Sequence, residues 1–248
     1  MKKLTLAIAC GTIFLSAPAL AADLGRLPAK APVTAVAPSP LFWNGFYVGA
    51  QVGYQWGNDH TAEFATATGL PTGFNRSFDG NGVVGGLHAG YNFQTGPLVF
   101  GVEGDVEGSG AGGGFTLPAA VAAGCMGAAA GNGTDFDSRW QASLRGRLGY
   151  AFGPTLLYVT GGAAFADLNY AYFTPAVRES FRTTEAGWTV GTGLEFAFTP
   201  AWSTRLEYRY TDFGRLTNAS AVAFPGSTFQ HDPNFHTIRL GVSYRFGG

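Results

Sequence analysis

The stretch that decides the fold is His236-Thr-Ile-Arg-Leu-Gly-Val-Ser-Tyr-Arg-Phe246, close to the C-terminus. From Ile238 onward every second residue is apolar, and the residues between them are small or cationic. A strict period of two is the pattern of a β-strand with one apolar face. An unpaired last strand would leave a bare sheet edge, which closure into a barrel removes. The stretch therefore predicts a β-barrel and leaves open which face meets which solvent.

Residues 1–21 have the features of a secretory signal peptide. Two lysines precede an apolar run from Leu4 to Leu15, and small residues at Ala19 and Ala21 form a signal-peptidase site. This run is too short to cross a bilayer as a mature helix, and no other run approaches the roughly 20 apolar residues that a membrane-spanning helix needs. We therefore predict that residues 1–21 are removed and that the mature chain has no transmembrane helix.

Charge and cysteine content exclude several classes of protein. Subtracting the two lysines of the signal peptide from the 15 basic residues leaves 13, against 16 acidic ones, which gives no indication of a nucleic-acid partner. Removal of the signal peptide leaves Cys125 as the single cysteine, which excludes a disulfide framework. Cys10 is an alternative lipoprotein cysteine, but the apolar run before it is too short and continues beyond it. Residues 22–42 contain several prolines and alanines without periodicity, so we predict an extended, disordered periplasmic lead-in.

The period of two recurs in eight segments of the chain. They cover residues 44–56, 82–94, 98–107, 138–152, 156–166, 187–198, 202–210 and 236–246. Three connections are tight, at 95–97, 153–155 and 199–201, and four are long, at roughly 57–80, 108–137, 167–186 and 211–235. Alternating short turns and long loops are typical of bacterial outer-membrane barrels. Residues 43–248 are therefore predicted to form an all-β, eight-stranded antiparallel up-and-down transmembrane barrel (OmpA/OmpX-like), with short periplasmic turns and long extracellular loops.

The aromatic residues indicate which face of the barrel meets lipid. On the apolar face they gather at the two ends of the strands, with aliphatic residues such as Val48, Leu144 and Val242 between them. The short-turn end has Phe46, Tyr91, Phe93, Tyr150, Phe152, Phe196, Phe198, Trp202, Tyr244 and Phe246, and the long-loop end has Tyr54, Trp56, Trp140, Trp188, Tyr208 and Tyr210. Two aromatic girdles around an aliphatic belt match two lipid interfaces and a hydrocarbon core. A secreted soluble barrel, the alternative, has no reason to sort aromatics to its rims.

Four stretches outside the last strand are distinctive in aggregate. They are Trp43-Asn-Gly-Phe-Tyr-Val-Gly49, Gly85-Gly-Leu-His-Ala-Gly-Tyr-Asn-Phe-Gln94, Gly187-Trp-Thr-Val-Gly-Thr-Gly-Leu-Glu195 and Trp202-Ser-Thr-Arg-Leu-Glu-Tyr208. Together they resemble the Omp25/Omp31 (RopB-like) outer-membrane proteins of alphaproteobacteria, and the resemblance runs from about Trp43 to Phe246. It implies a location in the bacterial outer membrane, with outer-membrane lipid and lipopolysaccharide as partners. Members of the family are often labelled porins, and some are reported to bind haemin or to act in host contact.

The last strand also resembles the signal that the barrel-assembly machinery reads. The matching residues are Gly241, Tyr244 and the terminal aromatic Phe246. Two glycines follow Phe246, whereas the usual signal ends at the aromatic residue itself. The resemblance therefore implies the barrel-assembly machinery as a further partner.

The polar face of the barrel carries charged residues that we expect to point into the lumen. These are Glu103, Asp105, Glu195, Glu207, Arg139, Arg145, Arg147, Arg205, Arg209, Arg239 and Arg245. Side chains roughly fill an eight-stranded barrel, and charges in so narrow a space need partners. The expected pairs on adjacent strands are Glu103 and Asp105 with Arg145, Glu195 with Arg205, and Glu207 with Arg239. The pattern predicts a salt-bridged plug, and a narrow or gated pore lined by arginines is the alternative.

The sequence does not indicate catalysis or a resident cofactor. Some eight-stranded outer-membrane barrels are lipid-modifying enzymes, but here no serine pairs with a histidine in a recognisable motif, so we predict that the protein is not an enzyme. His88 is expected to point inward at mid-strand. His60 and His231 are expected in loops and His236 at the rim of the long-loop end. A metal or haem site from these last three is the alternative, and solvated histidines without metal are the simpler interpretation.

The predicted function is structural and surface-facing. We expect an outer-membrane barrel with a largely plugged lumen and exposed loops that are competent to bind an extracellular ligand. The loop over residues 108–137 is rich in Gly and Ala and contains Cys125, and it is either a mobile surface loop or a binding loop. Two further hypotheses stay open: a small porin-like diffusion pore, and a surface receptor or adhesin for haemin or a host ligand.

Overall fold

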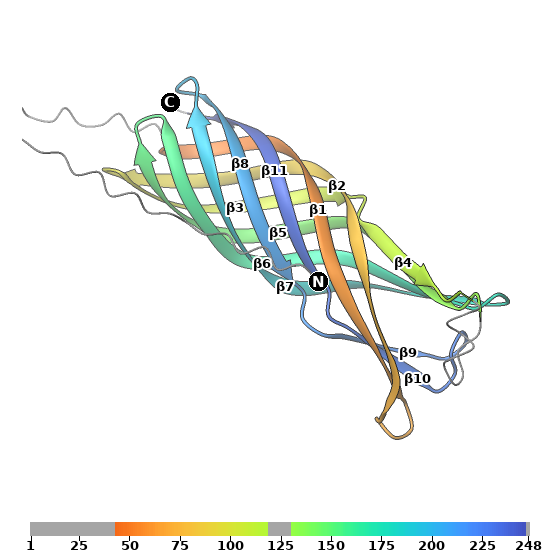
Figure 1. Cartoon of the computed structure of the whole chain (residues 1–248). Coiled ribbons are helices and arrows are strands. Elements are labelled where there is room, and N and C mark those ends of the chain that lie inside the picture. The colour runs from red at the N-terminus through yellow and green to blue at the C-terminus, as the bar shows by residue number, and fades with distance from the viewer. Residues whose placement is uncertain (1–42, 119–129, 247–248) are drawn as a thin grey trace, which may run out of the picture. The chain divides into compact units, whose positions relative to one another are not determined.

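The computed structural model describes residues 43–118 and 130–246, and Figure 1 gives its course. The predicted signal peptide, the lead-in over residues 22–42, Cys125 and the two final glycines lie outside the described residues. Over the described ranges, no helix has both the length and the apolar character that crossing a membrane requires.

Eleven β-strands make up the described part of the chain. Eight strands are long: β1 (Gly45–Ala65), β2 (Pro71–Thr95), β3 (Leu98–Ser109), β5 (Gly133–Phe152), β6 (Thr155–Phe173), β7 (Arg178–Ala197), β8 (Trp202–Asp212) and β11 (Asn234–Arg245). Three are short: β4 (Gly112–Thr116), β9 (Leu216–Ser220) and β10 (Ser227–His231). Each of the eight segments with a period of two falls on one of the long strands.

The long strands pair in a closed antiparallel ring. The order is β1-β2-β3-β5-β6-β7-β8-β11, and β11 pairs with β1 from Asn58↔Asn234 to Tyr47↔Arg245. Figure 1 shows β11 lying between β8 and β1 in this ring. Closure gives both edges of the last strand a hydrogen-bonding neighbour, so that this strand has no bare edge. Three tight turns lie together at one end of the ring, which we call the short-turn end.

The two faces of the ring differ in polarity as predicted. In β11, Leu240 is 58% exposed on the outer face, whereas Arg239 and Ser243 are 1% and 2% exposed on the inner face. The aromatic residue Phe93 of the short-turn girdle and Trp188 of the opposite girdle are likewise exposed, at 57% and 51%. An apolar exterior around buried charges reverses the arrangement of a soluble protein. It is the arrangement that a barrel in lipid requires.

Within the described residues, the long connections expected as loops are largely strand, so that prediction was wrong for those residues. β1 and β2 continue past their expected limits and form one hairpin whose turn lies at residues 66–70. β6 and β7 form a second such hairpin with its turn at residues 174–177, and β4, β9 and β10 occupy the described parts of the other two connections. Pairing continues because each extended strand keeps at least one neighbour that satisfies its main-chain N–H and C=O groups. We call these parts of the strands the extensions.

The extensions exchange the polarity of the two faces. Leu168, Tyr170 and Tyr172 of β6 are completely buried, and they alternate with Asp167 and Asn169. The buried residues belong to one cluster, which we call the aromatic core: Phe136, Ala164, Ala166, Leu168, Tyr170, Tyr172, Phe213, Leu216, Ala223, Phe229 and Phe235. Ion pairs lie on the opposite face, including Arg178–Asp135 at 2.9 Å and Arg182–Asp167 at 2.7 Å. An apolar interior beneath a charged exterior suits contact with water rather than lipid.

The ring opens on one side within the extensions, between β7 and β9. The order of strands there is β9-β10-β1-β2-β4-β5-β6-β7, in which β2 and β4 meet at Asn81↔Gly112. Residues 178–187 of β7 pair with β6 alone, and β9 pairs with β10 alone. The carboxylate of Glu179 crosses this gap, because it accepts hydrogen bonds from the Ser220 hydroxyl (2.6 Å) and from the N–H groups of residues 221–223 (3.1–3.2 Å).

Candidate functional site

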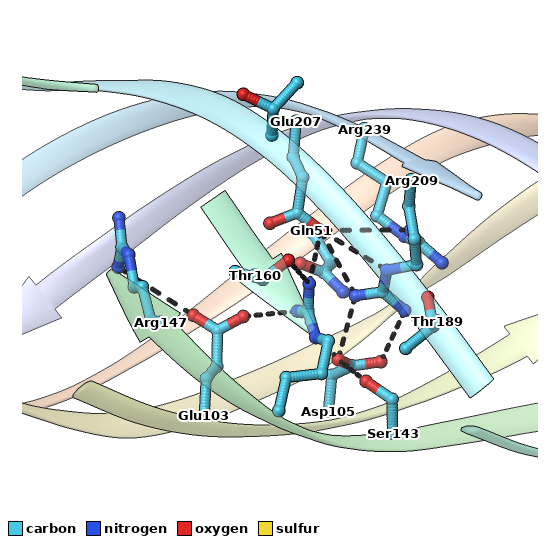
Figure 2. Close-up of polar contacts among 12 residues, drawn as sticks. Gln51, Glu103, Asp105, Ser143, Arg147, Thr160, Thr189, Glu207, Arg209 and Arg239 are labelled. Carbon is cyan, nitrogen blue, oxygen red and sulfur yellow. Dashed lines mark hydrogen bonds and ion pairs between the residues drawn. The ribbon is translucent and has the colours of Figure 1, made fainter. Parts of the chain in front are cut away.

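The candidate site is the set of charged side chains inside the ring, which we call the lumenal charge network. Its members are Glu103, Asp105 and Glu107 of β3, Arg145 and Arg147 of β5, Glu195 of β7, Arg205, Glu207 and Arg209 of β8, and Arg239 of β11. None of these residues is more than 4% exposed. Residues two apart in a strand point to the same face, so each strand contributes a column of charges at successive depths. Figure 2 shows carboxylates and guanidinium groups of facing strands pointing toward one another.

Arg145 lies at the centre of the network. Its guanidinium binds Glu103 Oε1 at 2.5 Å and Asp105 Oδ2 at 3.0 Å. These are the contacts that the sequence predicted for adjacent strands. A third carboxylate, Glu207 of β8, lies at 2.8 Å and reaches Arg145 from across the barrel, because the ring is narrow enough for one side chain to span it. The same guanidinium also donates to the Thr160 hydroxyl at 3.1 Å.

Glu195 and Arg205 do not form the predicted ion pair. The two residues are opposite each other in the register of β7 and β8, but their side chains choose other partners. Glu195 binds Arg147 and accepts a hydrogen bond from Ser203 at 2.5 Å. Arg205 crosses the lumen and binds Glu103 Oε2 at 2.6 Å. Adjacency in the sheet fixes which backbones meet, whereas long side chains in a narrow lumen reach several strands.

Arg239 and Glu207 are also neighbours in register, but their pairing is weak. Their nearest nitrogen and oxygen atoms are 4.0 Å apart. Arg239 instead donates two hydrogen bonds to the carboxylate of Glu107, at 2.8 and 2.6 Å. A bidentate pair of this kind is stronger than a single contact. The predicted pair is therefore replaced by a pair across the lumen.

One member of the network, Glu107, was not among the residues expected in the lumen, and it binds Arg239. It has the same period-two phase as the members that were identified, and that phase is the signal by which the sequence could have identified it. Arg209 was expected in the lumen but without a partner. It donates to both carboxylate oxygens of Asp105 at 3.2 and 2.9 Å and to Glu207 at 3.2 Å.

Arg139 was expected to point into the lumen, and the structure contradicts this expectation. It is exposed, and the pairing of β5 with β6 shifts register between Ser138 and Gln141. Such a bulge adds a residue to one strand and interrupts the alternation of faces. Arg139 consequently has no part in the lumenal charge network.

Neutral side chains complete the hydrogen bonding of the carboxylates. Tyr47 and Tyr158 donate to Glu103 and Glu207 at 2.7 and 3.0 Å. Further donors are Gln51 and Gln141 to Glu107, at 2.6 and 2.7 Å, and Ser143 to Asp105, at 2.5 Å. Buried charges are tolerated when they are both paired and hydrogen-bonded. Each carboxylate of the network meets that condition.

Apolar clusters lie on both sides of the network. At the short-turn end the buried residues Trp43, Val99, Leu156, Tyr158 and Ala197 pack together, and we call them the lower apolar cluster. Trp43 is fully buried and its indole N–H donates to the Gly153 carbonyl at 3.3 Å. At the other end lies the aromatic core. The charges therefore occupy a zone between two apolar layers.

The four histidines do not converge on one site. His88 faces the lumen as predicted, at 2.8 Å from the Ser243 hydroxyl, and His60 lies in β1 rather than in a loop. His236 is on the outer face, where it stacks on Trp56 with ring centroids 5.9 Å apart. The described residues contain no group of three or more His, Cys, Asp or Glu placed to hold a metal. The hypothesis of a three-histidine metal or haem site is therefore not supported.

His231 is buried in the aromatic core, not in a loop. Its Nε2 lies 2.6 Å from the Tyr172 hydroxyl and its Nδ1 lies 3.0 Å from Asp59 Oδ2. Burial raises the pKa of Tyr172. Both ring nitrogens of His231 therefore have a hydrogen-bonding partner, Nε2 the Tyr172 hydroxyl and Nδ1 the Asp59 carboxylate. The histidine thus joins β10, β1 and β6 through a fully buried polar contact.

The residues assigned to the assembly signal lie where the ring closes. Tyr244 packs edge-to-face on Phe246 with ring centroids 5.0 Å apart, and Phe246 lies 5.6 Å from Phe46 of the first strand. Gly241 faces inward, where an added Cβ would come within 3.2 Å of the Arg205 side chain. Its small size therefore leaves room for Arg205 to cross the lumen.

Comparison with known proteins agrees with this architecture. Residues 7–246 match the family described as outer membrane protein beta-barrel domain. The 31 kDa outer-membrane immunogenic protein of Brucella melitensis biotype 1 is 32% identical over 236 residues, which cover 92% of this chain and 93% of that protein. This chain belongs to the Omp25/Omp31 family of outer-membrane β-barrel proteins. The location in the outer membrane follows for this Omp25/Omp31 protein.

Two further similarities support the assignment. The 22 kDa outer membrane protein of Rhizobium leguminosarum bv. viciae is 32% identical to this Omp25/Omp31 protein, over 82% of this chain and 78% of that protein. The crystal structure of the outer membrane protein OprG from Pseudomonas aeruginosa superposes with a TM-score of 0.52 at 10% identity. That comparison covers 83% of this chain and 97% of OprG, and it supports the fold alone.

Proposed function

We propose that this protein is a non-conducting structural and surface protein of the outer membrane. It spans the membrane as an eight-stranded barrel, with its tight turns in the periplasm and its extensions outside the cell. The single observation that supports the proposal is the set of paired, buried charges inside the ring, which lies between the lower apolar cluster and the aromatic core. An aqueous path would have to displace all three layers.

The energetics of the charge network favour a plug over a pore. Removing one partner of a buried ion pair typically costs about 3–5 kcal/mol, because it leaves an uncompensated charge away from water. Arg145 alone contacts Glu103, Asp105 and Glu207, so opening a path beside it would break several contacts together. The network therefore holds the strands across the lumen and excludes ions from it.

The surface role rests on the extensions. Their apolar interior and charged exterior give them the character of a folded, water-exposed β-structure that rises from the membrane part of the barrel. The Brucella relatives carry the name outer-membrane immunogenic protein, which agrees with surface exposure in those proteins. We expect lipopolysaccharide to surround this end, the barrel-assembly machinery to insert the chain, and any extracellular ligand to meet the extensions. We propose no enzymatic activity.

The test is the conductance of the refolded mature protein in a planar lipid bilayer. We expect the wild type to show at most small, intermittent currents. Arg145→Ala removes the central contact of the network and should increase the frequency and size of the openings. The matched control is Arg178→Ala, because Arg178 is an exposed arginine of the extensions and its removal should leave the currents unchanged. Large, steady, anion-selective currents from the wild type would overturn the proposal in favour of an arginine-lined pore.

A further inference from the structure

Arg245 is the last inward-facing residue of β11 and lies at the short-turn end of the lumen. It is opposite Tyr47 of β1 in register, and its main-chain N–H donates to the Ala201 carbonyl in the turn between β7 and β8. Only 4% of Arg245 is exposed. Its guanidinium is thus held at the mouth of the barrel, below the lumenal charge network.

This guanidinium has no polar partner among the described residues. Its Nε and Nη1 atoms are buried and make no hydrogen bond, and no described carboxylate lies within ion-pair distance. Glu195, another inward-facing carboxylate of the ring, is already bound by Arg147 and Ser203. Buried N–H groups without an acceptor are rare and costly, and a buried charge without a partner costs more.

Among the described residues, the Arg245 guanidinium lies against an aromatic ring. Its central carbon lies 4.7 Å from the centroid of the Trp43 ring. A cation–π contact stabilises a positive charge, but it offers no acceptor for the N–H groups at the edge of the guanidinium plane. Trp43 therefore holds the guanidinium in place and leaves its hydrogen-bonding edge unsatisfied.

A count of the buried charges also identifies Arg245 as the arginine without a partner. Six arginines face the lumen of the described ring: Arg145, Arg147, Arg205, Arg209, Arg239 and Arg245. Five carboxylates face them: Glu103, Asp105, Glu107, Glu195 and Glu207. Every arginine except Arg245 is within 4 Å of one of these carboxylates. The excess of one positive charge therefore falls on the residue that also lacks hydrogen-bond acceptors.

We propose that Arg245 and Trp43 form a binding site for an oxyanion, a carboxylate or a phosphate group, at the short-turn mouth of the barrel. The planar guanidinium presents two parallel N–H groups that match the oxygen spacing of such anions. The lower apolar cluster excludes water beside it, which strengthens a charge-assisted hydrogen bond. Because the proposed function puts the tight turns in the periplasm, the site faces the periplasm. Only this location rests on the proposed function.

The experiment measures whether oxyanions stabilise the folded barrel. The mature protein is refolded in detergent, and the temperature at which half of it loses its compact gel mobility is measured against increasing inorganic phosphate, acetate or chloride. A ligand that binds only the folded state raises this temperature in proportion to the logarithm of its concentration once the site is filled. We expect that rise with phosphate and with acetate, and a smaller one with chloride. The phosphate and acetate arms distinguish which oxyanion the site prefers.

Arg245→Gln should abolish the oxyanion-dependent rise, whereas Arg245→Lys should keep the charge and lower the apparent affinity, because lysine lacks the two parallel donors. Arg178→Gln, which alters an exposed arginine at the opposite end, controls for general salt effects and should respond like the wild type. The same rise in all three variants, or none in the wild type, would overturn the site. Planar-bilayer conductance of the same preparation tests the proposed plug separately. A failure of the oxyanion site can therefore be distinguished from a failure of the plug.

Discussion

Glu107 and Arg239 show how individual residues hold this barrel together. They lie on different sides of the lumen, β3 and β11, and form a bidentate pair with both residues at most 1% exposed. Glu107→Ala leaves Arg239 buried without its main partner, so we expect a loss of about 3–5 kcal/mol in the free energy of unfolding in lipid vesicles. Glu107→Ala combined with Arg239→Ala should recover part of that loss. Denaturant titration of the three variants measures the coupling.

Glu207 provides the matched comparison for this cycle. It is the register neighbour of Arg239 but lies 4.0 Å from it at the nearest atoms. The coupling between Glu207 and Arg239 should therefore be clearly smaller than the coupling between Glu107 and Arg239. Equal couplings would mean that adjacency in the sheet, rather than the observed side-chain geometry, decides the pairing.

Glu179 gives the extensions a residue-level dependence on pH. Partial desolvation would raise the pKa of Glu179, but hydrogen bonds from Ser220 and from the N–H groups of Ala223, Ala221 and Val222 outweigh it and lower that pKa. A lowered folded-state pKa stabilises the fold above the unfolded pKa, about 4.3, and this stabilisation is lost as pH falls through the folded value. We expect amide protection of residues 221–223, corrected for intrinsic exchange, to stay constant from about pH 7 to pH 5 and to fall below about pH 4.

Glu179→Gln separates this contact from a general effect of acid. The variant should lose protection at residues 221–223 already at neutral pH, while amides in β11 remain protected. A wild type that loses protection between neutral pH and pH 5 would contradict the assigned contact, because the carboxylate remains ionised over that range.

At the scale of elements, β11 and β6 show what a period of two does and does not reveal. The phase of β11 assigns each of its side chains to the correct face, because alternation follows directly from strand geometry. The end of β6 was missed because its apolar positions switch from odd residues such as Leu157 to even residues such as Leu168 and Tyr170. The switch marks a change from lipid to water outside the strand, not the end of the strand. With that interpretation the sequence predicts the extension of β6.

The last strand carries an assembly prediction. Tyr244 lies near the end of β11, which closes the ring against β1, and Phe246 directly follows that strand. Their pattern resembles the signal of the barrel-assembly machinery. Phe246→Ala should therefore lower the amount of protein found in the outer membrane. Phe93→Ala is the control, because Phe93 lies in the same girdle with similar exposure, 57% against 48%, but on β2. Quantitative blotting of outer-membrane fractions measures both, and equal levels would count against a special role for the last strand.

At the scale of the whole molecule, the sequence was sufficient for the faces of the barrel but not for the partners inside it. Alternation places Glu195 and Arg205 on the inner face and opposite each other, and the structure has both features. It cannot say that Arg205 reaches Glu103 instead, because that choice depends on the width of the closed ring and on the space beside Gly241. The bulge that turns Arg139 outward has no period-two signature either. Which charged side chains pair inside the lumen is therefore decided by the width of the closed ring and not by which strands are adjacent.

The membrane placement of the whole barrel has a test that depends on depth. Leu144 lies on the outer face of β5 between the two girdles and is 65% exposed, and Val222 is similarly exposed, at 58%, within the extensions. An arginine facing lipid at the bilayer midplane costs about 2–4 kcal/mol, falling to about 0–1 kcal/mol near the interfaces. Leu144→Arg should therefore lower the free energy of unfolding in lipid vesicles by about 2–4 kcal/mol, and Val222→Arg by less than about 1 kcal/mol. Denaturant titration of both variants in the same vesicles measures the difference, and two equally small effects would mean that water, not lipid, covers the apolar face.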